Sequence, residues 1–135
     1  MTEINLELTQ ARQLKIQQYF KMWVTRNFEA LPMIFAVDCY YQECYGPAYL
    51  SLAEIQAWIE HQLTIQRVTT WSIQRLWSAT DKMIFVQWTF TAVTEQVTQF
   101  DGLSAVHFNS AGYIDDLREY QTTTKHHYPY HELND

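Results

Sequence analysis

The chain has 135 residues, of which 47% are hydrophobic and 16% aromatic, and its formal net charge is −6. This length suits a single domain with one sizeable core. The nine Lys and Arg residues are scattered, so no basic stripe could neutralise phosphates, and nucleic acid is not an expected partner. No apolar run approaches the roughly 20 residues of a membrane span, and the polar, acidic N-terminus does not resemble a signal peptide. We therefore expect a cytoplasmic protein without a membrane partner.

The first helix is predicted over residues 6–28, because apolar side chains recur there at three- and four-residue spacing. Asn5 precedes it and can cap its first turn. A second, short helix is predicted over residues 29–36. It is followed by a strand over residues 39–45 and the turn dipeptide Gly46-Pro47.

A third helix begins after Ser51, which has Glu54 three residues later and so forms a capping box. Its buried face is expected to carry Leu52, Ile55, Trp58, Ile59 and Leu63. The two cysteines, Cys39 and Cys44, lie five positions apart and would point to opposite faces of an extended strand. We expect both to be reduced thiols, which fits a reducing compartment.

The second half of the chain is rich in β-branched and aromatic residues and predicts four strands, over 68–79, 83–95, 97–109 and 113–123. The turn before the last strand ends on Gly112, which is free to adopt a positive φ. Because the helices come first and consecutive strands can pair as an antiparallel meander, the fold class is α+β. No repeat or boundary divides the chain, so residues 1–135 are expected to form one domain.

Three stretches of the chain carry a combination of motifs. They are YQECYGPAY over residues 41–49, VQWTF over 86–90 and FDGLSAVHFNSAGYIDDLREY over 100–120. Their order and spacing resemble those of the SnoaL-like and ketosteroid-isomerase-like families of the NTF2-like superfamily, over about residues 8–123. The resemblance implies a cone in which N-terminal helices pack on a curved, mostly antiparallel sheet around an apolar pocket. It also implies a homodimer packed sheet to sheet.

Glu43 is the main candidate for a catalytic residue. On a strand it would share a face with Tyr41 and Tyr45, and a carboxylate among aromatic rings loses hydration, which suits it to general-base work. The alternative is an ordinary solvated glutamate. The resemblance favours the first interpretation, because ketosteroid isomerases place their base carboxylate on this strand, just before a similar turn.

Tyr19 is the candidate partner of Glu43. It lies 24 residues earlier, a separation similar to that between the helix tyrosine and the strand carboxylate of the isomerases. A phenol there could donate a hydrogen bond to a developing oxyanion. The alternative is a core tyrosine in the apolar stripe of Ile16 and Trp23.

The match to the isomerases is incomplete on a late strand. Those enzymes place a protonated carboxylic acid beside the tyrosine, whereas the corresponding face here carries Gly102, Ser104 and Val106. Asp101 has the opposite parity. This difference disfavours steroid isomerase activity. Ser104, on the same face, is expected at the pocket.

The remaining pocket candidates are aromatic or lie near its mouth. Trp58, Trp88 and Phe90 would form walls that give shape and stacking surface. Asp38 could face the mouth, although an aspartate between a helix and a strand is usually a turn residue. His107 could pair with an acid, as in polyketide cyclases of this fold, or lie in solvent.

Neither a metal nor a cofactor is expected. The histidines at 126, 127 and 131 lack a recognised ligand spacing, and the chain has neither a phosphate-binding glycine loop nor a nucleophile elbow.

Two functions remain open. The first is a cofactor-independent isomerase, dehydratase or polyketide-cyclase-like enzyme, which would transfer a proton on a small, apolar carbonyl or hydroxyl compound through Glu43 and Tyr19. The second is a non-catalytic, dimeric ligand-binding or assembly module. In either case we expect a homodimer through the outer sheet face, where Tyr120 and Phe108 or their neighbours would be exposed.

Overall fold

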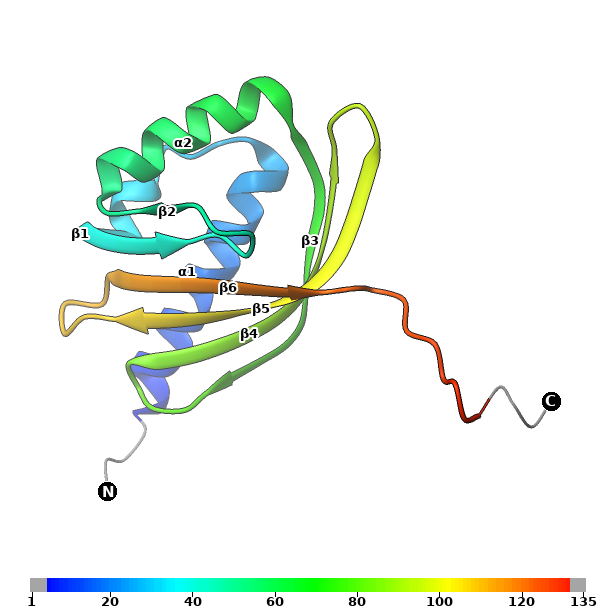
Figure 1. Cartoon of the computed structure of the whole chain (residues 1–135). Helices are drawn as coiled ribbons and strands as arrows, with labels where there is room; N and C mark the ends of the chain where they lie inside the picture. The colour runs from blue at the N-terminus through cyan, green and yellow to red at the C-terminus, as the bar shows by residue number, and fades with distance from the viewer. Residues whose placement is uncertain (1–4, 132–135) are drawn as a thin grey trace.

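The computed structural model describes residues 5–131 and consists of two helices packed on one curved sheet (Figure 1). The elements in chain order are α1 (Leu6–Thr25), the 3₁₀ turn η1 (Leu31–Met33), β1 (Phe35–Gln42), β2 (Ala48–Tyr49), α2 (Leu52–Ile65), β3 (Arg67–Ser78), β4 (Met83–Val93), β5 (Val97–Phe108) and β6 (Ile114–Thr122). The α+β class and the four strands of the second half are confirmed, with nearly the predicted bounds.

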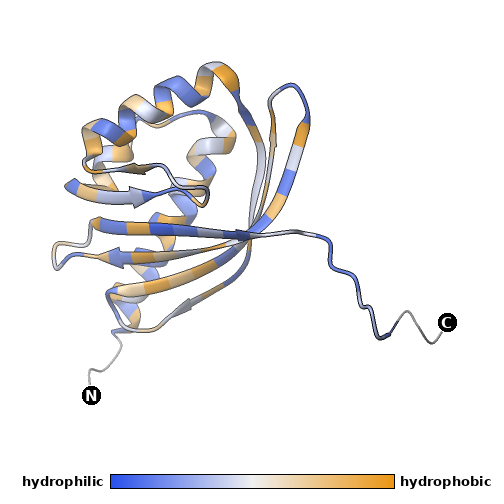
Figure 2. Ribbon diagram, viewed as in Figure 1, coloured by the Kyte–Doolittle hydropathy of each residue, from blue (hydrophilic) through white to orange (hydrophobic). Residues whose placement is uncertain are grey.

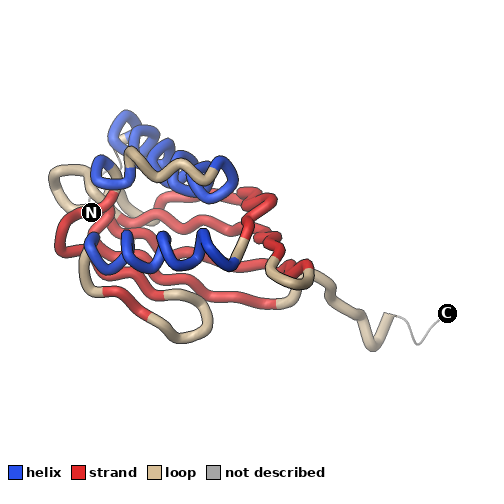
Figure 3. Tube along the Cα trace, turned by 90° about the horizontal axis from the view of Figure 1, so that it is seen from above, coloured by secondary structure: helices blue, strands red, loops and turns tan. Residues whose placement is uncertain are grey.

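The six strands form one sheet in the order β2-β1-β6-β5-β4-β3. All neighbouring strands are antiparallel except β1 and β6, which run parallel. Helix α1 packs against β3 and helix α2 against β1, and the view from above shows the two helices as separate rods beside the strands (Figure 3). This arrangement confirms the predicted NTF2-like fold.

Alternation of side chains along the strands separates the core from the outer face of the sheet. Hydrophobic and hydrophilic residues follow one another along the strands, and the segment after β6 is mostly hydrophilic (Figure 2). On β5 the buried positions are Gly102, Ser104, Val106 and Phe108. The predicted outward position of Phe108 is therefore wrong, because it continues the inner-face alternation and is fully buried. Tyr120 does lie on the outer face, with 51% of its surface exposed.

Both predicted helix caps are present. The Asn5 side chain accepts a hydrogen bond from the Leu8 N–H at 3.1 Å, and the Ser51 hydroxyl accepts one from the Glu54 N–H at 3.2 Å. Helix α1 ends three residues earlier than predicted, because Arg26 adopts the left-handed conformation with φ 64°.

The segment between α1 and the turn at Gly46 differs from the prediction. The expected helix over 29–36 is only the single turn η1, and β1 already begins at Phe35. The reason is a sheet partner, since Phe35 pairs in register with Ile114 of β6. Strand β1 also ends at Gln42, so Glu43 is the first residue of the turn that follows, in which Gly46 has φ 119°.

Candidate functional site

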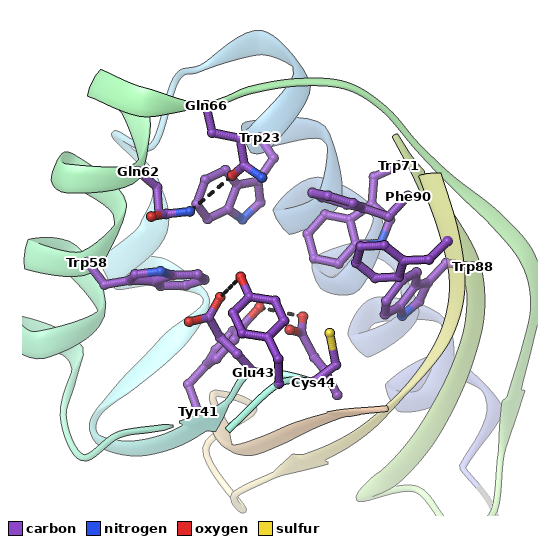
Figure 4. Close-up of a pocket in the computed structure, with 13 residues that line it drawn as sticks. Trp23, Tyr41, Glu43, Cys44, Trp58, Gln62, Gln66, Trp71, Trp88 and Phe90 are labelled. Carbon is purple, nitrogen blue, oxygen red and sulfur yellow. Dashed lines mark hydrogen bonds between the residues drawn. The ribbon is translucent and has the colours of Figure 1, made fainter. Parts of the chain in front are cut away.

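A cavity of about 40 Å³ lies between the helices and the inner face of the sheet (Figure 4). This volume accommodates roughly three water molecules. Tyr45, which lines the cavity, is itself 59% exposed, so the cavity reaches solvent beside it. The lining residues are Trp23, Tyr41, Glu43, Cys44, Tyr45, Trp58, Gln62, Gln66, Trp71, Trp88, Phe90, Phe100 and Glu119.

One aromatic wall is centred on Trp58 of α2. Tyr49 of β2 stacks on this indole, with ring centroids 4.9 Å apart and an interplanar angle of 19°. Trp23 of α1 meets it at 5.2 Å with a tilted ring. Aromatic contacts on two sides fix the orientation of Trp58, because offset and edge-on pairs are the favoured geometries.

The opposite wall is formed by Trp71, Trp88 and Phe90 (Figure 4). The Trp71 ring meets the other two edge-on, at centroid distances of 5.5 Å to Trp88 and 5.4 Å to Phe90. Trp88 lies directly over Gly102 of β5, where an added Cβ would come within 2.2 Å of the indole. Its ring N–H donates to the Ser104 hydroxyl at 2.9 Å. Glycine and serine at these positions therefore set the position of this wall.

Glu43 lies at the floor of the cavity and is held by two phenols. Its Oε1 accepts a hydrogen bond from Tyr45 at 2.8 Å, and its Oε2 accepts one from Tyr49 at 2.7 Å. Burial and the hydrogen bond to Glu43 raise the pKa of Tyr45 and of Tyr49. Both phenols therefore stay protonated and act as donors. The carboxylate is 6% exposed although it belongs to a turn.

Glu119, in the middle of β6, supplies a second buried carboxyl group. Its Oε2 accepts a hydrogen bond from Tyr41 at 2.7 Å, and the Tyr41 hydroxyl accepts one from Tyr19 at 2.7 Å. Burial raises the pKa of Glu119 to about 8, and the nearby Glu43 charge adds to the rise, while the hydrogen bond from Tyr41 opposes it. At neutral pH Glu119 is therefore mostly a neutral acid, which can donate a hydrogen bond.

Five of the predicted site residues line the cavity together: Tyr41, Glu43, Trp58, Trp88 and Phe90. The other three do not. Tyr19 is fully buried behind Tyr41, so its hydroxyl reaches a phenol rather than the cavity. Asp38 is exposed on β1, next to the buried Cys39, and the buried Ser104 hydroxyl accepts the hydrogen bond of the Trp88 ring N–H.

Sequence analysis missed Glu119, a buried acid on a late strand. It comes from β6 rather than from the stretch around Ser104, its register partner on β5. A signal was present in the sequence, because Glu119 lies two residues after the apolar Leu117 and so shares its face. Trp71 was also overlooked. Its position along strand β3 was the only sign in the sequence that it faces inward.

Two further predictions concern His107 and the two cysteines. His107 lies on the outer face of β5, with its Nδ1 2.6 Å from the Asp115 carboxylate, so its acid partner is remote from the cavity. Cys39 and Cys44 are free thiols. Cys44 belongs to the turn after β1 and not to the strand, so the predicted opposition across a strand does not apply.

Within residues 5–131 no three His, Cys, Asp or Glu side chains are grouped so that they could hold a metal ion. In the same part of the chain, no helix is long and apolar enough to cross a membrane.

Comparison with known proteins identifies the family to which this chain is similar. The family model of the SnoaL-like domain matches residues 16–116. No curated protein sequence is similar enough to the chain to count as a match.

Several solved structures share the fold at low sequence identity. A candidate polyketide cyclase from Xanthomonas campestris is 12% identical, with a TM-score of 0.71 over 85% of this chain and 93% of its own. A hypothetical protein with a ketosteroid-isomerase-like fold from Catenulispora acidiphila, in complex with trimethylamine, is 14% identical, with a TM-score of 0.70 over 82% and 85%. A steroid delta-isomerase from Pseudomonas aeruginosa is 13% identical, with a TM-score of 0.63 over 92% and 85%. The chain belongs to the SnoaL-like domain family of the NTF2-like superfamily.

Proposed function

We propose that the cavity is the active site of a cofactor-independent enzyme that transfers a proton on a small carbonyl or hydroxyl compound. Isomerisation, dehydration and aldol-type cyclisation all belong to this class. The observation that carries the proposal is the pair of buried carboxyl groups, Glu43 and Glu119, which line one cavity in different hydrogen-bond environments. Two titratable groups held in different environments are the usual basis for separate acid and base roles.

Glu43 is the base in this mechanism. It removes a proton from the carbon or hydroxyl of a compound held between the two aromatic walls. The two phenols that donate to its oxygens keep the carboxylate in one orientation before the reaction. Such positioning lowers the barrier because the catalytic group needs no reorganisation.

Glu119 is the acid. The Oε2 atom of Glu119 accepts a hydrogen bond from Tyr41, whereas Oε1 has no partner within residues 5–131. Oε1 is therefore available to a ligand. A proton on Oε1 would donate to the ligand oxygen on which negative charge develops. Tyr41 takes the place expected for Tyr19, because it joins the helix tyrosine to Glu119 and lines the cavity itself. Tyr19 then acts as a positioning residue.

The proposal is tested by proton exchange, which needs no known substrate. The protein is incubated in D₂O with a panel of small ketones and aldehydes, and loss of the α-hydrogen signals is followed by proton NMR. Glu43→Gln keeps the size and hydrogen bonding of the side chain but removes the base. We expect the exchange rate to fall about 100-fold or more.

The matched control is Glu60→Gln, which removes an exposed carboxylate from α2 outside the cavity lining and is expected to leave exchange unchanged. Equal rates for the wild type and Glu43→Gln with every exchanging compound would contradict the proposal.

The second candidate is a non-catalytic ligand-binding or assembly module. It is favoured by the small, aromatic cavity and by the complex of the similarly folded Catenulispora protein with trimethylamine. Ligand-induced shifts of indole NMR signals without any exchange or conversion of the ligand would support this alternative over catalysis.

We also propose a two-fold homodimer through the outer face of the sheet. Trp77 and Phe85 stack there with centroids 6.1 Å apart, and Trp77 is 38% exposed. Tyr120 adds an exposed ring on β6. Light scattering should give twice the chain mass, and a monomer at all practical concentrations would contradict the dimer.

A further inference from the structure

The cavity has acidic side chains in its described lining but no basic ones. Its described lining contains two carboxyl groups, Glu43 and Glu119, and no Lys, Arg or His. An anionic ligand would meet the Glu43 charge in a partly desolvated site without a compensating cation, which is costly. The lining therefore favours a neutral or a positively charged ligand.

The rings of the cavity decide between these two. Eight of the thirteen lining residues are aromatic, and they come from both walls. The face of an aromatic ring carries negative charge and attracts a cation within about 6 Å of its centroid. A ligand between the Trp58 wall and the wall of Trp71, Trp88 and Phe90 is flanked by such rings (Figure 4).

No cation of the described protein occupies these rings. Four cation–π contacts are present within residues 5–131, and all of them lie outside the cavity: Arg12 on Phe108, Lys15 on Tyr113, Arg75 on Trp77 and Arg118 on Tyr40. Phe20 covers one face of Trp71 and Tyr49 covers one face of Trp58, but no described cationic side chain competes for these rings with a cation that comes from outside.

We propose that the ligand of this cavity carries a tertiary or quaternary alkylammonium group. The inference rests on the cavity being the ligand site of the proposed function, and it names the chemical class of the ligand. The positive charge lies between the aromatic walls and is balanced by the Glu43 carboxylate. The cavity volume of about 40 Å³ limits the cationic end to a small group.

The hydrogen-bond acceptors around the cavity favour an alkylated ammonium over a primary one. Both oxygens of Glu43 already accept from phenols, and the side-chain amides of Gln62 and Gln66 are bonded to each other at 3.2 Å. A primary ammonium brings three donors, which would compete with these existing hydrogen bonds for acceptors. Methyl groups in place of those hydrogens need no acceptor and pack against the rings.

The test compares two probes of the same shape. Choline carries a trimethylammonium group, and 3,3-dimethyl-1-butanol carries a tert-butyl group in its place. Binding of each is measured by titration of the tryptophan indole N–H signals in NMR spectra. We expect choline to bind about tenfold more tightly, because the alcohol lacks the cation–π and charge interactions.

Two variants locate the interaction. Glu43→Gln should weaken choline binding and leave that of the alcohol unchanged, and Trp58→Leu should weaken choline binding more than that of the alcohol. Glu60→Gln removes an equal charge from the protein surface and should change neither. Equal affinities for the two probes, no binding of choline, or an equal loss in Glu60→Gln would overturn the inference. None of these results touches the exchange assay with neutral ketones, so failure of the ligand class and failure of the catalytic proposal are distinguishable.

Discussion

The side of the cavity that carries Glu43 is assembled from residues close together in the chain, whereas the side that carries Glu119 is assembled from four strands. On the first side, here called the turn side, Glu43, Tyr45, Tyr49 and Trp58 all lie within one short segment. On the second, the sheet side, Tyr41 reaches Glu119 across 78 positions of sequence, and Trp88 reaches Ser104 across 16. Local geometry thus orients one carboxyl group, and strand register orients the other.

The two sides also differ in the hydrogen bonding and burial of their carboxyl groups. On the turn side two phenols donate hydrogen bonds to the Glu43 carboxylate, one to each oxygen. On the sheet side a single phenol donates, and burial dominates, so the pKa of Glu119 is raised to about 8. The predictions below test this difference, beginning with the largest expected effect.

Glu119 should make the protein less stable as the pH rises. Its pKa is about 8 in the folded state and near 4.5 in the unfolded chain, so between these values the folded state binds more protons. The free energy of unfolding should therefore be highest below about pH 4.5 as far as this group is concerned. It should fall by roughly 1.4 kcal/mol per pH unit towards pH 8, and then level off.

The measurement is urea unfolding at several pH values for the wild type and Glu119→Gln. The variant has no proton to lose at this position, so its unfolding free energy should depend less on pH from 5 to 8. Identical pH profiles would show that Glu119 is not a buried acid in the folded protein.

Gly102→Ala should disturb the sheet side and leave the turn side intact. The new methyl group would lie 2.2 Å from the Trp88 ring, so the indole must move. Overpacking of this kind costs about 1–3 kcal/mol. In NMR spectra the Trp88 indole N–H should shift strongly as its bond to Ser104 is lost, and the Trp58 signal should shift little. An unchanged Trp88 signal would contradict the close approach of ring and backbone.

Tyr49→Phe and Tyr45→Phe compare two donors to the same carboxylate. Loss of the Tyr49 hydrogen bond should cost about 1 kcal/mol of unfolding free energy, which is typical of a single bond. Loss of the Tyr45 bond should cost less, because Tyr45 is 59% exposed and water can replace its hydroxyl. Chemical denaturation of the two single variants checks this order. A larger loss of unfolding free energy for Tyr45→Phe than for Tyr49→Phe would contradict it.

The same local-versus-distant difference explains what could be predicted from the sequence. Glu43, Tyr41 and Trp58 could be assigned to the pocket because the strand, the turn and the capped helix follow one another directly. Glu119 could not, because its place beside Tyr41 depends on the pairing of β6 with both β1 and β5, and each pairing contains a register shift.

Errors in the prediction have the same origin. The spacing of Tyr19 and Glu43 is compatible with contact, but it does not show that Tyr41 lies between the helix tyrosine and the cavity. Phe108 was placed outside although the parity of Ser104 and Val106 puts it inside. The four strands and both caps were predicted well because they depend on neighbouring residues alone.

The measurement that tests this account most directly is the titration of the Glu119 carboxyl carbon by ¹³C NMR, with Glu119→Gln used to assign the signal. The account predicts a midpoint near pH 8, because burial disfavours the charged form and Glu119 is the neutral acid of the cavity. A midpoint near the ordinary glutamate value of about 4.3 would mean that Glu119 is charged at neutral pH, and its assignment as the acid would be wrong.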